Sequence, residues 1–272
     1  MNAPVRLGGP HLTAIGSGKG GTGKTLLATS LAHALAHEGE RVLLLDADLG
    51  LSNAGIHLGL ESAGDLEGVL AGASSIADAV VPVLGGIAAR GGFDLLAAPA
   101  GSGALANASE TMAKKLVAQL RAAKSYDRIL LDLAAGVERA TMAFAALSDD
   151  AVLVLTPDPA SLTDAYAFAK LYLRETGGRV PLVLVNMASS EAEARRTGES
   201  LAATCRAFLK VVPGSLGSIP RDAHALQSVR RQAQLLTLHP QSPAALAVVS
   251  AARKLHARIG PGLAPVTAQG LR

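Results

Sequence analysis

The stretch Gly18-Lys19-Gly20-Gly21-Thr22-Gly23-Lys24-Thr25 decides the fold. It fits the pattern G-x-x-x-x-G-K-[ST] at every fixed position. The glycines allow the backbone to wrap around a phosphate group, and the N-terminus of the following helix attracts the anion. Lys24 is then placed to contact the β- and γ-phosphates, and the hydroxyl of Thr25 to bind Mg²⁺. The sequence therefore predicts a phosphate-binding loop for a nucleotide with its metal.

The pattern also has the context that it needs, a strand before it and a helix after it. Nearly continuous apolar runs predict strands covered on both faces, at Leu12–Ser17, Arg41–Asp46, Asp94–Ala97, Arg128–Asp132, Ala151–Thr156 and Val180–Val185. Helical patterns alternate with them, at Lys24–Glu38, Ser109–Lys124, Val137–Leu147, Ser161–Thr176 and Glu191–Leu209. This alternation predicts a doubly wound α/β fold, with a mostly parallel sheet and helices on both faces. Ligands of such folds bind beyond the carboxyl ends of the strands.

The composition indicates one large domain. Of 272 residues, 49% are hydrophobic and 17% charged, which supplies a sizeable core. We expect a short N-terminal tail at 1–11, a single P-loop ATPase domain at 12–259 and a flexible C-terminal tail at 260–272. No targeting segment precedes the first strand and no apolar run is long enough to span a bilayer, so a cytoplasmic protein is expected. A single cysteine, Cys205, excludes an internal disulfide and a C-x-x-C metal site, and we interpret it as a small hydrophobic residue in a helix.

Acidic residues follow two of the predicted strands. Asp46 and Asp48 leave the second strand two positions apart, so their side chains point the same way. Asp132 ends the fourth predicted strand, and Gly136 follows where its N–H can reach a γ-phosphate. A site for Mg²⁺ and ATP needs carboxylates that hold metal-bound waters and orient the attacking water. Because no residue pattern fits a covalent mechanism, we expect slow transfer of a phosphoryl group from ATP to water.

Lys19 is a second lysine, directly after the first glycine of the loop. The loop thereby resembles K-G-G-x-G-K-[ST], the deviant phosphate loop of the MinD/ParA family in the SIMIBI class of P-loop NTPases. The resemblance implies a homodimer that sandwiches ATP, in which Lys19 reaches the phosphates of the partner's nucleotide. It assigns catalysis to Lys19, Lys24 and Asp48, and the surroundings of Mg²⁺ to Thr25, Asp46 and Asp132. The implied nucleotide-binding set is Gly18, Lys19, Gly20, Gly21, Thr22, Gly23, Lys24, Thr25, Gly136, Asn186, Pro220 and Asp222.

Within that set, the resemblance implies that Asn186 and the loop Ile219-Pro220-Arg221-Asp222 hold adenine. Seen alone, each is an ordinary turn. The string Thr156-Pro157-Asp158-Pro159-Ala160-Ser161-Leu162-Thr163-Asp164-Ala165-Tyr166 predicts a capping box with Ser161 as N-cap and Asp164 three residues later. It also resembles T-P-[ED]-P-x-S-[IL]-T-D-A-Y of the FlhG/FleN type, MinD-like ATPases that set the number and placement of bacterial flagella. The resemblance spans 13–255 and implies a regulatory partner, such as a flagellar GTPase or regulator.

Two features of the sequence leave open whether the protein docks on a membrane, on DNA or on another protein. Residues before the first strand lack the D-Q-A-x-x-L-R element with which many FlhG/FleN proteins stimulate a partner GTPase, so that activity is not expected. The stretch Pro243–Ile259 predicts a helix with apolar residues on one side and basic ones on the other; these are Leu246, Val249, Ala252, Leu255 and Ile259, and Arg253, Lys254 and Arg258. Such a helix can contact an anionic membrane from the cytoplasmic side. It can equally pack on the sheet, which we favour because it carries no large aromatic anchor.

Other functions are open as well. A ParA-like ATPase that partitions cargo on nonspecifically bound DNA would use arginine pairs, and the candidates are Arg195, Arg196, Arg230 and Arg231. Recognition of a specific nucleic-acid sequence is not expected, because aromatic residues make up only 3% of the chain and the net charge is only +3. A metabolic relative that carries a metal cluster is disfavoured, since Cys205 stands alone.

Overall fold

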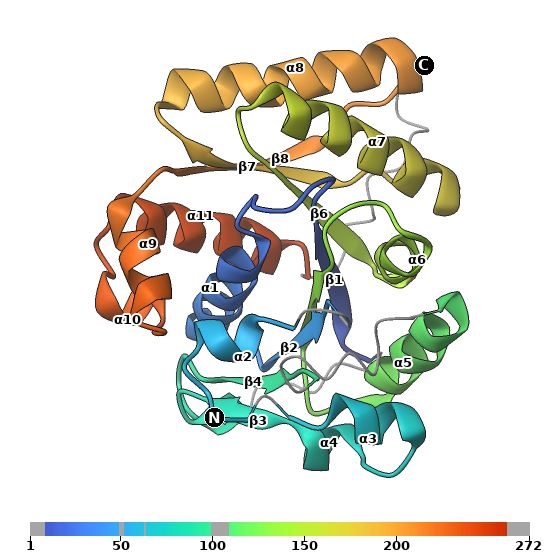
Figure 1. Cartoon of the computed structure of the whole chain (residues 1–272), viewed down its shortest axis with the longest axis vertical. Coiled ribbons are helices and arrows are strands. Elements are labelled where there is room, and N and C mark those ends of the chain that lie inside the picture. Colours follow the sequence, from blue (N-terminus) through green and yellow to red (C-terminus); the bar gives the residue numbers. More distant parts are fainter. Residues whose placement is uncertain (1–8, 49–51, 63, 99–108, 260–272) are drawn as a thin grey trace.

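A computed structural model describes residues 9–48, 52–62, 64–98 and 109–259. Its centre is an eight-stranded sheet with the order β3-β4-β2-β5-β1-β6-β7-β8 (Figure 1). The strands are β1 His11–Gly16, β2 Val42–Ala47, β3 Val81–Val83, β4 Phe93–Leu96, β5 Arg128–Leu133, β6 Asp150–Leu155, β7 Leu182–Ala188 and β8 Gly214–Pro220. Neighbours from β4 to β8 pair in parallel, and β3 pairs antiparallel with β4 at one edge. The predicted doubly wound α/β fold is confirmed.

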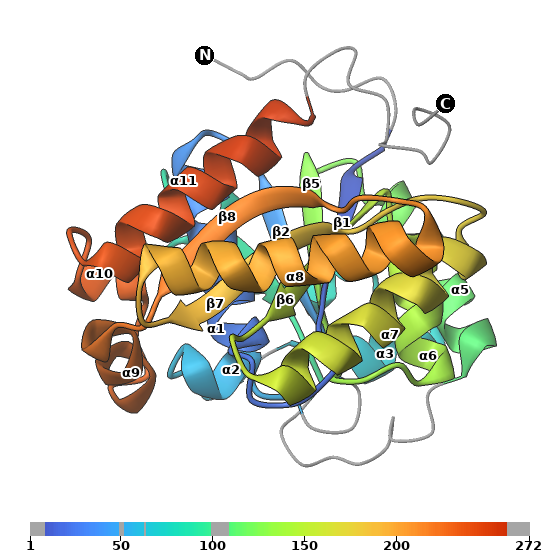
Figure 2. The same cartoon turned by 90° about the horizontal axis from the view of Figure 1, so that it is seen from above.

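Helices cover both faces of this sheet. The larger ones are α1 Lys24–His37, α5 Glu110–Ala122, α6 Arg139–Leu147, α7 Pro159–Glu175, α8 Glu191–Leu209 and α11 Pro243–Ala257. The shorter ones are α2 Ala54–His57, α3 Leu66–Ala71, α4 Ile76–Ala79, η1 Gly86–Ala88, α9 Ala223–Arg230 and α10 Leu235–Leu238. Figure 2 shows α11 and α8 on opposite sides of β8. Among the described residues, every helix is too short or too polar to span a bilayer.

The core consists of two hydrophobic clusters, one on each face. Alternate residues of a strand point to opposite faces, so Leu43 and Leu45 of β2 join one cluster and Val42 and Leu44 join the other. The helices α5 to α8 pack on the first cluster, and α1 and α11 pack on the second. Cys205 of α8 is fully buried and burial raises its pKa to about 11, which confirms its interpretation as a small hydrophobic residue.

The six predicted strands are present, each displaced by no more than three residues at either end. Two further strands were not predicted. β3 contains only three residues, one of them proline. β8 reads Gly-Ser-Leu-Gly-Ser-Ile-Pro, and we interpreted its end, with Arg221 and Asp222, as an ordinary turn because Pro-x-Asp is common in turns. That interpretation is wrong, since β8 gains its backbone partners from β7 at the edge of the sheet. Most of the predicted N-terminal tail and all of the C-terminal one lie outside the described residues.

The helix predicted at Pro243–Ile259 is α11, and it packs on the sheet as favoured. Of the predicted apolar side, Ala252 and Leu255 are buried, whereas Leu246 is 52% exposed. The residues that it buries are Ala244, Ala245, Val248, Ala251, Ala252 and Leu255. The predicted basic side has intramolecular partners. Arg253 donates to Glu38, Lys254 to the carbonyl of Leu216, and Arg258 to Asp150.

Candidate functional site

The predicted phosphate loop joins β1 to α1 at the carboxyl edge of the sheet. Gly23 caps the N-terminus of α1 in the left-handed region, with a φ of 84°, and Gly21 has a φ of 75°. A Cβ atom added at Gly20 or Gly21 would meet no atom within 4 Å, and both residues line two adjoining cavities. Backbone at these positions therefore borders open space at the N-terminus of a fourteen-residue helix, which is the arrangement that binds phosphate.

Close packing requires glycine at Gly16 and Gly18 and again at Gly23. A Cβ atom at Gly18 would lie 2.2 Å from the backbone carbonyl oxygen of Asp164 in α7. One at Gly16 would lie 2.7 Å from the Phe168 ring, and one at Gly23 would lie 2.5 Å from Nδ2 of Asn186. The phosphate loop is thus held directly between the start of α7 and the end of β7.

Lys24 lies at the start of α1 among the predicted acidic residues. Its side chain is largely buried. Burial lowers the pKa of its ammonium, and three neighbouring carboxylates, Asp132 foremost, oppose the shift. Asp132 is buried at the end of β5, where burial and the nearby carboxylate of Asp46 raise its pKa to about 8. The structure therefore brings together Lys24, Asp46 and Asp132 as predicted from the strand ends.

Asp46 organises the segment that follows β2. Its oxygens accept hydrogen bonds from the N–H groups of Asp48, Asn53 and Ala54, at 2.9 to 3.0 Å, and from the Ser52 hydroxyl at 2.9 Å. Both carboxylate oxygens are thus engaged by the chain itself in this conformation. Asp48, the predicted hydrolysis residue, lies two residues beyond Asp46 and lines the larger cavity.

The residues fit a magnesium ion that arrives with the nucleotide. No cluster of three or more His, Cys, Asp or Glu side chains suited to a metal occurs in the described part of the chain. Mg²⁺ needs few protein ligands, because phosphates and waters supply the rest. Oδ1 of Asp132 is buried without a hydrogen-bond partner, and Asp132 also accepts a hydrogen bond from Thr25. Thr25 and Asp132 are therefore the groups that would hold the ion or its waters, and a bound Mg²⁺ would neutralise charge on the phosphates.

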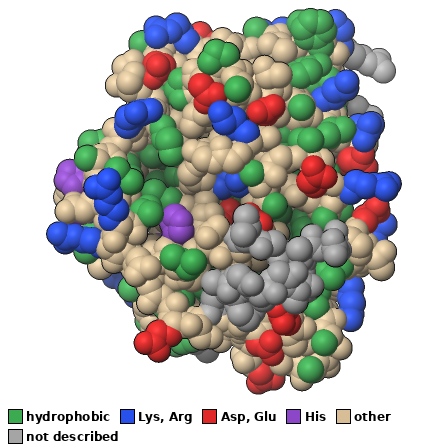
Figure 3. Space-filling model, viewed as in Figure 1, with side chains coloured by type: hydrophobic (Ala, Val, Ile, Leu, Met, Phe, Trp, Pro, Cys, Tyr) green, Lys and Arg blue, Asp and Glu red, His purple; other side chains and the backbone are tan. Residues whose placement is uncertain are grey.

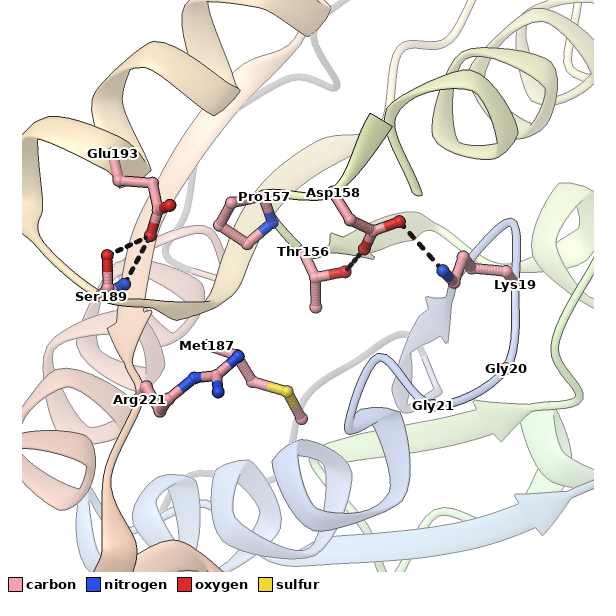
Figure 4. A pocket seen from close by; sticks show the side chains of 10 residues that line it. All are labelled: Lys19, Gly20, Gly21, Thr156, Pro157, Asp158, Met187, Ser189, Glu193 and Arg221. Carbon is pink, nitrogen blue, oxygen red and sulfur yellow. Dashed lines mark hydrogen bonds and ion pairs between the residues drawn. The ribbon is translucent and has the colours of Figure 1, made fainter. Parts of the chain in front are cut away.

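Two cavities adjoin the loop. The larger, about 850 Å³, extends from Lys24 and Thr25 past Asn186 and Pro220 to apolar side chains of α9, α10 and α11. Figure 3 shows a hollow lined by hydrophobic side chains on this face of the molecule. The smaller, about 620 Å³, is lined from the other side of the loop by Lys19 and Asp158 (Figure 4). Together they offer space for a phosphate chain at the loop and a base beside it.

Comparison with known proteins shows to which family the loop and the domain around it belong. The family model of the CobQ/CobB/MinD/ParA nucleotide binding domain matches residues 13–235. The chain belongs to the MinD/ParA family. Members of this family are ATPases, so the reaction of the site is the hydrolysis of ATP.

Individual relatives agree with this assignment. The antiactivator FleN of Pseudomonas aeruginosa is 35% identical over 246 residues, which cover 90% of this chain and 86% of FleN. The flagellum site-determining protein YlxH of Helicobacter pylori is 28% identical, with 97% and 88% covered. Among solved structures, the MinD cell division protein of Aquifex aeolicus matches with a TM-score of 0.72 at 29% identity, covering 91% of this chain and 97% of MinD. MinD of Pyrococcus horikoshii, solved with Mg-ADP, has a TM-score of 0.73 at 25% identity, with 90% and 96% covered.

Lys19, the lysine that marks the MinD/ParA loop, is paired within its own chain. Its Nζ lies 3.0 Å from Oδ1 of Asp158 (Figure 4). Asp158 also accepts hydrogen bonds from the Thr156 hydroxyl and the Ser161 N–H, and these bonds together with Lys19 lower its pKa to about 2. Asp158 is therefore the N-cap of α7, and the capping box predicted with Ser161 as N-cap is wrong. Ser161 lies inside the first turn, where its hydroxyl accepts the N–H of Thr156.

The remaining predicted residues are found around the larger cavity. Asn186 donates from Nδ2 to the carbonyl of Thr22 at 2.8 Å, so it ties β7 to the phosphate loop. Pro220 ends β8 and lines the cavity. Asp222 lines it too, but its carboxylate accepts the N–H groups of His224 and Ala244 and so caps α9 and holds the start of α11.

Gly136, predicted to contact a γ-phosphate, donates its N–H to the carbonyl of Ser17 at 2.9 Å. A contact with phosphate would need that bond to open. Sequence reasoning missed Met187, which lines both cavities, and included Arg221, which also lines both, only as part of the loop implied to hold adenine. Arg221 stands inside the quoted Ile-Pro-Arg-Asp string, whereas no sequence pattern pointed to Met187.

Proposed function

We propose that this protein is a cytoplasmic ATP-dependent switch that controls the number or placement of flagella through a regulatory protein partner. The name of YlxH, a flagellum site-determining protein, supports the flagellar role, and the name of FleN, an antiactivator, supports action through a regulatory partner. The single observation that carries the mechanism is the position of Lys19. Its ammonium lies at the edge of the smaller cavity, paired with Asp158, while Lys24 occupies the base of the phosphate loop.

The position of Lys19 supports an ATP-bound homodimer. The side chain is 35% exposed and its only described ionic partner, Asp158, is itself 43% exposed. Such a pair in water contributes little and exchanges readily. In the proposed dimer, Lys19 leaves Asp158 and contacts the phosphates of the nucleotide in the second copy. ATP is then sandwiched between two chains, Asp48 orients the attacking water, and hydrolysis returns the protein to the monomer.

The partner is proposed to recognise the dimer and not α11. The basic residues of α11 bind Glu38, Leu216 and Asp150 within the chain. The apolar residues that α11 buries on the sheet are not available to a bilayer, and the exposed Leu246 alone is a small anchor. We therefore expect the purified protein to stay in the supernatant with anionic liposomes and either nucleotide.

Multi-angle light scattering of the purified protein tests the dimer. We expect Asp48→Ala to block hydrolysis and to be dimeric with Mg-ATP and monomeric with Mg-ADP. Lys19→Ala in the same background should bind ATP and remain a monomer. If Asp48→Ala stays monomeric with saturating Mg-ATP, the proposed dimer is wrong. Retention on DNA that requires ATP and falls steeply with salt would instead favour the ParA-like function.

A further inference from the structure

Two histidines lie on one face of α1, at its C-terminal end. His33 and His37 are four positions apart, which makes their side chains neighbours on the helix surface. Their Nε2 atoms are 3.0 Å apart, whereas the centres of the two rings are 4.8 Å apart, so the Nε2 edges face each other. This is the spacing with which two histidines of one helix bind a metal ion.

The distance between the two nitrogen atoms fits a shared ion. A bond from imidazole nitrogen to a metal such as zinc is about 2.0–2.1 Å long. Because the Nε2 atoms are 3.0 Å apart, they would subtend an angle between about 90° and 97° at an ion bound to both. This angle is close to that between neighbouring ligands of an octahedral or square-planar ion, and it is smaller than the tetrahedral angle that zinc adopts. Nickel and copper ions take such geometries and bind imidazole, so they fit the pair better than zinc.

Neighbouring groups leave the two imidazoles available to an ion. His33 is buried, and burial together with His37 lowers its pKa to about 4, so its ring is unprotonated at neutral pH. Nδ1 of His33 has no hydrogen-bond partner, so among the described residues only His37 forms a hydrogen bond with this ring. The two acidic residues that follow in the sequence, Glu38 and Glu40, are paired with arginines. The histidines therefore have each other as their partners.

Solvent reaches the pair from the side of His37, which is exposed. The backbone of Gly91 lies against the His37 ring, and a Cβ atom there would be 2.7 Å from Nε2. Glycine at this position thus leaves the atom that faces His33 uncrowded. In the part of the chain that the structure describes, no third His, Cys, Asp or Glu joins the pair as a metal ligand, so waters would complete the coordination.

We propose that His33 and His37 form a binding site for a divalent transition-metal ion of the nickel or copper type, with waters as its other ligands. The site is separate from that of the nucleotide and its magnesium. Lys24 and Thr25 begin the same helix, so at about 1.5 Å per residue the histidines lie about 12–20 Å further along it. Magnesium does not compete for the pair, because it prefers oxygen ligands.

Isothermal titration with Ni²⁺ tests this site, on the full chain without an affinity tag, stripped of metal and in the presence of Mg-ADP. We expect one ion to bind per chain. His37→Asn should weaken binding at least about tenfold, since even the loss of a group that only orients a ligand costs about 10–100-fold. Ni²⁺ should also raise the Tm of the unmodified protein, because an ion that prefers the folded chain stabilises it. His37→Asn should lose most of that increase.

His224→Asn is the matched control. His224 is exposed, and its ring centre lies 4.4 Å from that of His239, but these two histidines are not four positions apart on one helix. This variant should bind Ni²⁺ as the unmodified protein does, and thermal unfolding without metal checks that both variants fold.

Unchanged binding in His37→Asn would overturn the proposal, and so would an equal loss in His224→Asn. The absence of a site with one ion per chain in the unmodified protein would overturn it as well. None of these results depends on the ATP-bound dimer, so the metal site and the proposed switch can fail independently of each other.

Discussion

Arg128 lies in a buried ionic cluster at the amino end of the sheet, far from the phosphate loop along β5. Its side chain is fully buried. Its guanidinium donates to Glu40 at 2.7 and 3.3 Å, to the Thr13 hydroxyl at 2.8 Å and to the carbonyl of Leu255 at 2.9 Å. It thereby joins β1, β5, the turn before β2 and the end of α11. Glu40 is 7% exposed and also lies 2.7 Å from Nδ1 of His256.

We expect Arg128→Met to destabilise the protein strongly, because it leaves the Glu40 carboxylate buried without its main partner. Breaking a buried pair from one side costs about 3–5 kcal/mol. For a domain of this size that cost lowers Tm by about 6–20 °C. Equilibrium unfolding in urea measures the loss, and an unchanged m value would confirm that it lies in the native state.

The double variant Arg128→Met with Glu40→Gln separates the pair from its packing. We expect it to recover part of the loss, since the isolated charge is gone. Arg174→Ala is the matched control for an exposed Arg–Glu pair, with Glu175 at 2.7 Å and side chains 69% and 45% exposed. Its cost should be below about 1 kcal/mol. If Arg128→Met costs no more than this control, or if the double variant is less stable than the single one, the reasoning is refuted.

Three further predictions follow from the site and from α1. Gly18→Ala places a methyl group against the backbone of Asp164, so we expect a loss of about 1–3 kcal/mol in urea unfolding. The methyl group of Gly20→Ala meets no atom within 4 Å, so this variant should be as stable as the unmodified protein and bind ADP more weakly. If Gly18→Ala and Gly20→Ala were equally stable, the close packing of Gly18 on Asp164 would be contradicted. Asp132→Ala should remove most of the dependence of ADP affinity on Mg²⁺ in titrations with and without EDTA, and a full magnesium effect in this variant would exclude Asp132 from the metal site. Burial and the neighbouring His37 lower the pKa of His33 to about 4. The unfolded histidine binds its proton near pH 6.5, whereas the folded one binds it only near pH 4. The free energy of unfolding therefore falls by on the order of 2 kcal/mol as the pH drops from 6.5 toward 4, and this stability is fully present above pH 6.5. His33→Gln should flatten that part of the curve of unfolding free energy against pH, and an unchanged slope would assign it to other groups.

Much of the fold and of the phosphate site was predictable because it depends on short stretches of chain. The loop from Gly18 to Thr25 needs only its glycines, its lysine and the helix that follows. The central strands are apolar runs that a parallel sheet buries on both faces. Asp46 and Asp132 were predicted to meet because the carboxyl ends of parallel strands share one edge of the sheet.

Other features were decided by tertiary contacts. The residues of β8 resemble a turn and become a strand only because β7 offers them a partner. The N-cap of α7 is Asp158 and not Ser161, and the same carboxylate pairs with Lys19 of the phosphate loop, 139 residues away along the chain. The buried face of α11 follows from the shape of α1 and β8 beneath it, so Leu246 is left outside although its spacing fitted the apolar side.

The sequence by itself determined the chemistry of this protein: a phosphate loop, its lysines and the carboxylates for a metal. Only the tertiary structure decided which partners these groups take within the chain, such as Asp158 for Lys19, and which side chains, such as Met187 and Arg221, border the space for a base. The physical reason is range. Turn conformation and strand burial are encoded within a few residues, whereas a hydrogen-bond partner more than a hundred residues away exists only after the sheet has assembled.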